Sequence, residues 1–232
     1  DALAKKHIVA IRGRFRPVTN IFLDMLQKGV RQFENEEDVD DDKVCILSEL
    51  TLRNLEDGTH RINEKDFLDR VDILCSLGQT VLISNFHEYF MLVAFLSQFS
   101  KLKMALIMGM PNLEYIFDEK HYKDLPGGII SAFASLFGQK IKLYLYPTLN
   151  EQGEIIHLET FETEPHLAGL LTYLKDNEKL EDIQKYDEKL MTIRTDNVLG
   201  MIQHGVGDWE KMVPASVAKQ IKENHLFGYA NH

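Results

Sequence analysis

Tryptophan, cysteine and proline are scarce in this 232-residue chain, which contains one, two and six of them. Two sulfurs, at Cys45 and Cys75, do not make a metal site at this spacing. Each cysteine lies in an apolar run, which is typical of a buried thiol in a reducing compartment. Hydrophobic residues at 44% and charged residues at 27% exclude disorder, collagen and coiled coil as the main content. We expect one large domain, or one domain with a small appendage.

The chain also lacks long hydrophobic runs, and its basic residues are fewer than its acidic ones. No apolar stretch reaches the ~20 residues of a membrane span, and the opening DALAKK lacks the hydrophobic segment of a signal peptide. The 26 basic residues face 36 acidic ones, so the net charge of −10 repels nucleic acid and anionic lipid. We therefore expect a cytoplasmic protein with no nucleic-acid or membrane partner. The chain starts without methionine and soon enters an apolar run. We therefore expect it to be a fragment or a processed piece of a longer protein.

Short β-type runs alternate with longer helical patterns over the first two-thirds of the chain. The predicted strands are 7–11, 44–50, 80–84, 104–108 and 141–146. The predicted helices between them are 18–33, 63–78, 89–99, 113–117 and 129–137. Such alternation predicts right-handed crossovers and a mostly parallel sheet with helices on both faces, a three-layer α/β fold. A partial or complete β/α barrel is the alternative, because strand order is not readable from the sequence.

The pattern changes after about residue 150. Residues 153–161 have the features of a hairpin arm or an edge strand, and helical patterns follow at 166–174, 197–203 and 215–222. We predict an α/β sheet domain over residues 1–164 and a helical C-terminal extension over 165–232, packed on that domain.

Polar side chains follow the apolar strands, and ligands of open parallel sheets bind beyond the carboxyl ends of the strands. We predict an anion site there; its candidate residues are Arg12, Arg14, Arg16, Asn54, Ser84 and Asn85. Guanidinium groups match phosphate and carboxylate geometry. The candidate general acids or bases are Glu49 at a strand end and His87 after a strand. No metal site is predicted, and the sequence identifies no cofactor.

Two structural alternatives compete with the anion site. The three arginines could pair with the acidic segment 34–42, which holds seven acids in nine positions and is expected to be a solvated loop. Glu49 could instead satisfy the arginines internally. Gly127 and Gly128 precede a predicted helix, but no Walker loop or dinucleotide fingerprint accompanies them.

Long segments of the chain resemble the C-terminal half of a bacterial family whose members are of roughly twice this length. The resemblance runs from His7 to Tyr229 and rests on RGRFRPVTNIFLDML, ELTLRNL, DFLDRVDILCSLGQTVLISNF, PNLEYIFDEKHYKDLPGGIISAFASLFG, KLYLYP and DWEKMVPASVAKQIKENHLFGY. Members carry two different labels, nicotinate-nucleotide adenylyltransferase and TonB-dependent receptor. The resemblance implies that an N-terminal half is a partner of this chain. The family has no assigned catalytic residues that could be transferred to this sequence.

The chain departs from both labels. Its β-α alternation does not match the receptor. Adenylyltransferases of this class carry a His-x-Gly-His-type motif after the first strand, where this chain has Arg-Gly-Arg-Phe-Arg. Three functions stay open: binding of a phosphorylated or carboxylated, nucleotide-like metabolite; a non-catalytic interaction or oligomerisation module, including a homo-oligomer; and the adenylyltransferase activity that the first label implies.

Overall fold

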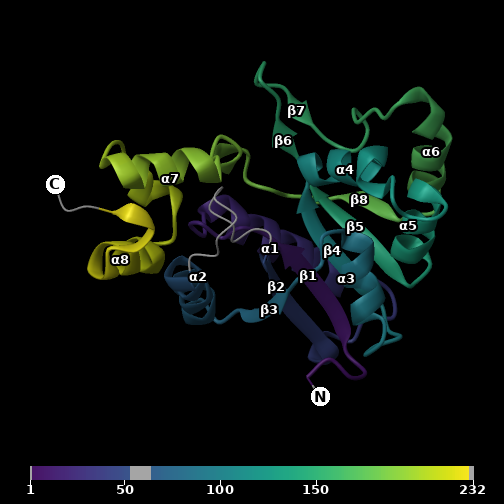
Figure 1. The fold of residues 1–232 in the computed structure, drawn as a ribbon, viewed down its shortest axis with the longest axis horizontal. Coiled ribbons are helices and arrows are strands. Elements are labelled where there is room, and N and C mark those ends of the chain that lie inside the picture. The colour runs from purple at the N-terminus through teal and green to yellow at the C-terminus, as the bar shows by residue number, and fades with distance from the viewer. Residues whose placement is uncertain (1, 53–63, 230–232) are drawn as a thin grey trace. The chain divides into compact units, whose positions relative to one another are not determined.

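The computed structural model describes residues 2–52 and 64–229, and its strands and helices alternate as the sequence predicts (Figure 1). The strands of its main sheet are β1 (His7–Arg12), β2 (Val44–Thr51), β3 (Thr80–Ser84), β4 (Met104–Gly109), β5 (Ile141–Tyr146) and β8 (Leu180–Asp182). The α-helices are α1 (Asn20–Glu34), α2 (Glu64–Ser76), α3 (Tyr89–Leu96), α4 (Met110–Phe117), α5 (Gly128–Phe137), α6 (Ala168–Asp176), α7 (Thr195–His204) and α8 (Ala215–Asn224). Strands β6 (Thr148–Leu149) and β7 (Ile155–Ile156) pair antiparallel.

In the described residues, the main sheet has six strands in the order β3-β2-β1-β4-β5-β8. The recorded pairings β1–β4, β4–β5, β5–β8 and β2–β3 are all parallel. Helices flank the sheet, so the prediction of a three-layer α/β fold is confirmed. The barrel alternative is wrong, because β3 and β8 stand at the two open edges of this sheet.

The central strands are buried on both faces. Residues Ile8 to Ile11 of β1 are at most 2% exposed, and residues Met104 to Met108 of β4 are at most 3% exposed. A strand that is apolar on both faces needs cover from both sides, and crossover helices supply it in parallel sheets. This requirement explains why such short apolar runs already predict the layered fold.

The chain forms two compact units, each assembled from three separate stretches of sequence. Unit 1 comprises residues 1–11, 27–46 and 86–186, and unit 2 comprises residues 12–26, 47–85 and 187–232. The division of the chain after residue 164 stays a prediction.

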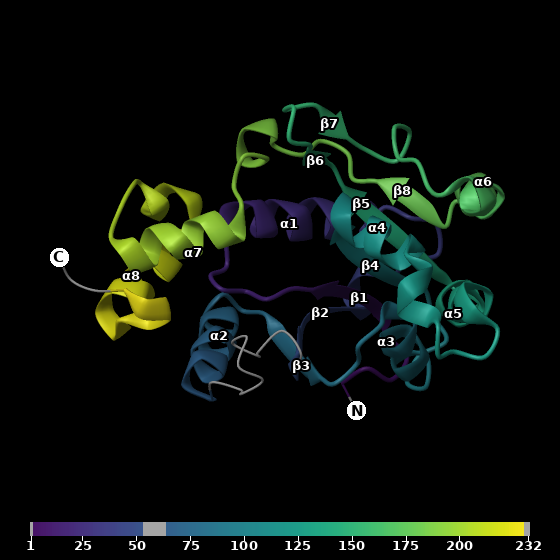
Figure 2. The ribbon, with the colours of Figure 1, turned by 45° about the horizontal axis from the view of Figure 1, so that its top comes forward.

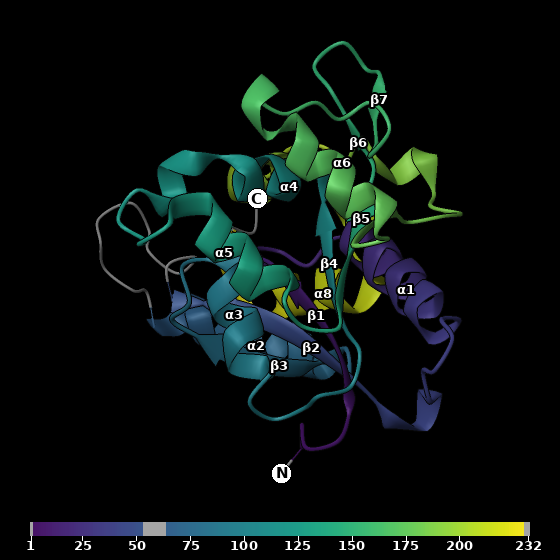
Figure 3. The ribbon, with the colours of Figure 1, turned by 90° about the vertical axis from the view of Figure 1, so that its right-hand side faces the viewer.

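Unit 1 contains most of the sheet and the helices that cover it. The part of α1 in this unit lies against β4, where Gly29 allows a close approach to Ile107. Figure 3 shows α5 on the other side of β4 and β5 from α1. Phe33 of α1 makes an edge-to-face contact with Tyr144 of β5, at 6.4 Å between ring centroids. Such contacts fix α1 on the sheet through large buried rings.

The acidic segment 34–42 also belongs to unit 1, and it pairs with lysines. Glu36 accepts hydrogen bonds from the Tyr144 hydroxyl and from Lys103, and its carboxylate lies 2.7 Å from Lys142 Nζ. The predicted pairing of this segment with the arginines after β1 is therefore not found in the described residues. Glu36 is half-buried, so the expectation of a fully solvated segment is also wrong at this residue.

Unit 2 is built around helices α2, α7 and α8. Figure 2 shows α7 and α8 next to each other, and the short turn Leu226–Gly228 contacts α2, α7 and α8. Its core also includes Phe15 and Val18, which follow β1. Trp209 is 4% exposed and packs edge-to-face on Tyr229. The C-terminal helices therefore fix the segment that carries the arginines.

Several sequence expectations need correction. The stretch predicted as a helical extension also contains β8, whose three residues Leu-Glu-Asp are too short and too polar to give a strand pattern. Cys45 is half-buried and Cys75 is exposed on α2, so the expectation of two buried thiols is wrong. Helix α1 begins at Asn20 rather than Val18, and α4 begins at Met110 rather than Leu113.

Candidate functional site

The first arginine after the apolar part of β1 is held by a buried carboxylate. Arg12 donates from Nε to Glu49 Oε2 at 2.8 Å and from Nη2 to Oε1 at 3.0 Å. The Ser84 hydroxyl donates to Glu49 Oε1 at 2.5 Å. Glu49 is fully buried and the Arg12 side chain is 8% exposed. The ends of β1, β2 and β3 are thus joined by one bidentate, charge-assisted pair.

The second arginine faces solvent. Arg14 Nη2 lies 2.6 and 2.7 Å from the two carboxylate oxygens of Asp196, in the first turn of α7. The Arg14 side chain is 55% exposed and that of Asp196 is 68% exposed. An exposed pair of this kind contributes at most about 1 kcal/mol, so its partners can be exchanged at low cost.

The third arginine meets a fourth one at a shared carboxylate. Arg16 donates from Nε to Asp66 Oδ1 at 2.7 Å, and Arg70, one helical turn further along α2, donates to Asp66 Oδ2. Arg70 Nη1 also donates to the backbone carbonyl of Arg14 at 3.3 Å. Arg70 therefore connects α2 to the segment after β1, and Asp66 orients both Arg16 and Arg70.

The carboxylate of Asp66 joins Arg16 and Arg70 directly, and the charges of Arg14 and Arg16 act on Arg70. Burial lowers the pKa of Arg70, Asp66 opposes that effect, and the charges of Arg16 and Arg14 lower the pKa further. We call Arg14, Arg16 and Arg70 the arginine cluster. Its members lie in unit 2, with Arg16 31% exposed and Arg70 4% exposed.

The other predicted site residues are less informative. Asn85 and His87 are exposed, directly after β3. Asn54 lies outside the described residues. Glu49 accepts hydrogen bonds from both Arg12 and Ser84. To act as a general base, the Glu49 carboxylate would first have to release these two donors.

Sequence reasoning missed Asp66, Arg70 and Asp196. Asp66 and Arg70 stand four residues apart on a predicted helix, a spacing that places them on one face and could have suggested the pair. Asp196 lies 182 residues from Arg14 in sequence, and no local pattern connects two such distant positions.

Within residues 2–52 and 64–229, no group of three histidine, cysteine or acidic side chains is arranged to hold a metal ion. No helix of this described part is long and apolar enough to cross a membrane.

The arginine cluster has the chemistry of an anion site. Guanidinium groups donate hydrogen bonds in a planar fork that fits two oxygens of a phosphate or carboxylate. Arg14 and Arg16 keep part of their surface open to solvent, and α7 begins at the carboxylate that Arg14 holds. The positive end of a helix dipole also favours negative charge.

The three-layer fold is similar to that of one solved adenylyltransferase. No family model matches the chain, and a search of curated proteins finds no match. The chain is similar to the solved nicotinic acid mononucleotide adenylyltransferase of Plasmodium falciparum in complex with APC, with a TM-score of 0.54 and 11% identity over 97% of this chain and 98% of that one. A structure from Vibrio parahaemolyticus named for nicotinate-nucleotide adenylyltransferase matches with a TM-score of 0.36 and 8% identity, over 97% of each chain.

Proposed function

We propose that this chain binds a phosphorylated, nucleotide-like metabolite at the arginine cluster. The observation that carries the proposal is the grouping of Arg14, Arg16 and Arg70 in the segment after β1 and the facing helix α2. This segment follows a central strand of a parallel sheet, and ligands of such sheets bind beyond the carboxyl ends of the strands.

Arg14 and Arg16 are the proposed ligand contacts, because both are partly exposed. Arg70 is nearly buried and donates to Asp66 and to the Arg14 carbonyl, so we assign it a positioning role. Arg12 has a structural role in this proposal, since its bidentate pair with Glu49 is buried and costly to open.

Asp196 occupies the position where we expect the anion. Its carboxylate lies in the first turn of α7 and accepts hydrogen bonds from Arg14. A phosphate in the same place would gain the Arg14 contact and the helix N-terminus together. Because the Arg14–Asp196 pair is exposed, little stability is lost when the phosphate displaces the carboxylate.

The nucleotide class is supported by the similarity in fold to the Plasmodium protein, which was solved with APC. The proposal stops at binding, since Arg-Gly-Arg-Phe-Arg stands after β1 where that class of enzyme has His-x-Gly-His. In unit 2, the described histidines His204 and His225 lie at the C-terminal ends of α7 and α8. The N-terminal half implied by the family resemblance stays a proposed partner.

Isothermal titration of the purified chain with adenosine, AMP, ATP and pyrophosphate tests the proposal. We expect affinity to rise with phosphate number and adenosine to bind weakest. Arg14→Ala should weaken ATP binding about tenfold, because a hydrogen bond to a charged group contributes about 1.5–3 kcal/mol. Lys219→Ala is the matched control, because Lys219 is also exposed and pairs with a carboxylate, Glu223.

Equal ATP affinities in Arg14→Ala and Lys219→Ala would contradict the proposal. Adenosine binding as tightly as ATP would contradict it as well, because the phosphates would then contribute nothing. Circular dichroism of both variants verifies that the folded state is retained.

A further inference from the structure

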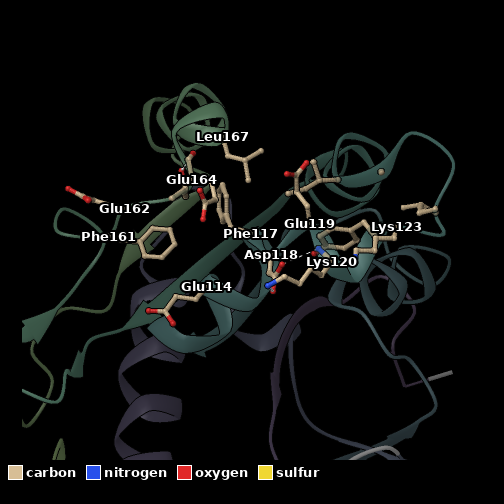
Figure 4. A pocket seen from close by; sticks show the side chains of 15 residues that line it. Glu114, Phe117, Asp118, Glu119, Lys120, Lys123, Phe161, Glu162, Glu164 and Leu167 are labelled. Atoms are coloured by element: carbon tan, nitrogen blue, oxygen red, sulfur yellow. Dashed lines mark hydrogen bonds and ion pairs between the residues drawn. The ribbon is translucent and has the colours of Figure 1, made fainter.

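Unit 1 contains a cavity of about 720 Å³, and none of its lining residues is one of the sequence-predicted site residues. It is lined by α4, the turn after it, the start of α5 and residues 161–167. Its volume falls in the range of small-molecule sites, roughly 300–1,000 Å³. Figure 4 shows Phe117, Phe161 and Glu164 on one side of the pocket and Lys123 on the other.

The apolar part of the lining includes two phenylalanine rings that touch each other. Phe117 and Phe161 are 5% and 7% exposed, and their rings meet edge-to-face at 5.8 Å. Phe133 of α5 packs edge-to-face on Phe117 at 5.1 Å, which holds the Phe117 ring in place. Fixed aromatic rings offer a ligand apolar surface, and their faces attract positive charge.

The polar part of the lining is mainly negative. Five carboxylates line the pocket against two lysines. Asp118 pairs with Lys120, and Glu119 pairs with His166. Glu114, Glu162 and Glu164 have no ion pair among the residues that the structure describes. The pocket therefore combines aromatic rings with three carboxylates that lack a cationic partner there.

A buried carboxylate adds to this negative potential. Glu88 is 7% exposed, and its Oε1 accepts a hydrogen bond from the Tyr115 hydroxyl at 2.9 Å. Its Oε2 has no hydrogen-bond partner within the described part of the chain. Burial raises the pKa of Tyr122, a lining residue, and the charge of Glu88 raises it further. Glu88 thus acts electrostatically on the wall of the pocket.

We infer that this pocket binds a small organic cation, with an ammonium head and an apolar body. The body lies on Phe117 and Phe161, and the head lies on the side of Glu164 rather than the side of Lys123. All residues that line the pocket lie in unit 1, and none of them belongs to the arginine cluster or to the phosphate binding proposed there.

Three probes of similar size and different charge test the inference: benzylammonium, benzyl alcohol and benzoate, titrated into the full chain and followed by NMR chemical shifts. We expect benzylammonium to bind at least about tenfold more tightly than benzyl alcohol, and benzoate to bind weakest, because the lining favours positive charge. Added salt should weaken benzylammonium binding and leave benzyl alcohol binding unchanged.

Glu164→Gln should weaken benzylammonium binding about threefold or more and leave benzyl alcohol binding unchanged, since only the charge is removed. Glu151→Gln is the matched control, because Glu151 is an exposed acid outside the lining. Phe161→Ala should weaken both probes. Equal affinities of the three probes, or benzoate as the tightest, would overturn the inference. So would a Glu164→Gln variant that binds benzylammonium like the wild type.

Discussion

The guanidinium of Arg12 and the carboxylate of Glu49 form two hydrogen bonds, at 2.8 and 3.0 Å, with Glu49 fully removed from solvent. The Ser84 hydroxyl satisfies the same carboxylate from β3. Burial of two charges is tolerated only when they are paired and hydrogen-bonded. The pair therefore joins the ends of β1, β2 and β3 next to the segment that carries Arg14 and Arg16.

Glu49→Ala should destabilise the protein by about 3–5 kcal/mol, because it removes the buried carboxylate that pairs with Arg12 and accepts a hydrogen bond from Ser84. Urea denaturation followed by circular dichroism measures the free energy of unfolding. The double variant Arg12→Met/Glu49→Met should recover most of the loss, since it removes both charges together. A single variant that loses less than about 1 kcal/mol would mean that Arg12 finds water or another carboxylate.

Asp196→Asn should raise the affinity for ATP by about two- to fivefold, because it removes the carboxylate that competes for Arg14, and an exposed pair contributes at most about 1 kcal/mol. The same change should lower the free energy of unfolding by about 0.3–1 kcal/mol, since an acid in the first turn stabilises a helix. Glu223→Gln is the control, an exposed acid on α8 that pairs with Lys219. Unchanged or lower ATP affinity in Asp196→Asn would place the phosphate elsewhere.

Glu36 should make unit 1 sensitive to acid. Burial alone would raise the pKa of Glu36, but hydrogen bonds from Lys142, Tyr144 and Lys103 outweigh it, and the pKa lies below its ordinary 4.5. The stabilisation is therefore complete above about pH 4.5 and is lost as the pH falls through the folded-state pKa.

Urea denaturation between pH 6 and pH 3 measures this loss. Glu36→Gln should lower stability at pH 6 by about 1.5–3 kcal/mol, the contribution of hydrogen bonds to a charged group, and should flatten the decline towards acid. Glu151→Gln, at an exposed position, should follow the wild-type curve. A Glu36→Gln curve parallel to the wild type would assign the acid sensitivity to other carboxylates.

Much of the fold follows from periodicity alone. The predicted strands 80–84 and 141–146 agree with β3 and β5, because a short apolar run between helical patterns has few other interpretations. Strand β8 was not predicted, because its residues Leu180–Asp182 have no strand pattern of their own in the sequence. They form a strand by pairing with β5. The order of the strands is a property of tertiary packing and has no local signal.

The residue types of the candidate site can be read from the sequence, but their geometry cannot. The arginines after β1 point to anion chemistry by residue type alone. Which of them is free to bind depends on partners that are distant in sequence: Glu49 for Arg12, and Asp196 for Arg14. Only the three-dimensional structure separates the buried Arg12 pair from the exposed Arg14 pair, and the separate roles that we propose for the two arginines rest on that difference.

Gly29 and Gly169 both lie inside helices, and the structure predicts opposite effects of alanine at the two positions. A Cβ at Gly29 would lie 2.6 Å from Ile107 Cδ1 and 2.8 Å from Ile107 Cγ1, while Ile107 is 1% exposed and cannot move into solvent. Around Gly169 of α6, the structure places no atom within 4 Å of a new Cβ.

Gly169→Ala should stabilise the protein by about 0.5–1 kcal/mol, because alanine loses less backbone entropy in a helix. Gly29→Ala should instead destabilise it by about 1–3 kcal/mol, since overpacking against β4 outweighs the same helical gain. Urea denaturation of the two variants measures both effects. Ile107→Val removes the Cδ1 methyl, so Gly29→Ala/Ile107→Val should lose less stability than the two single changes added together. Strict additivity would show that α1 does not approach β4 as closely as Gly29 allows.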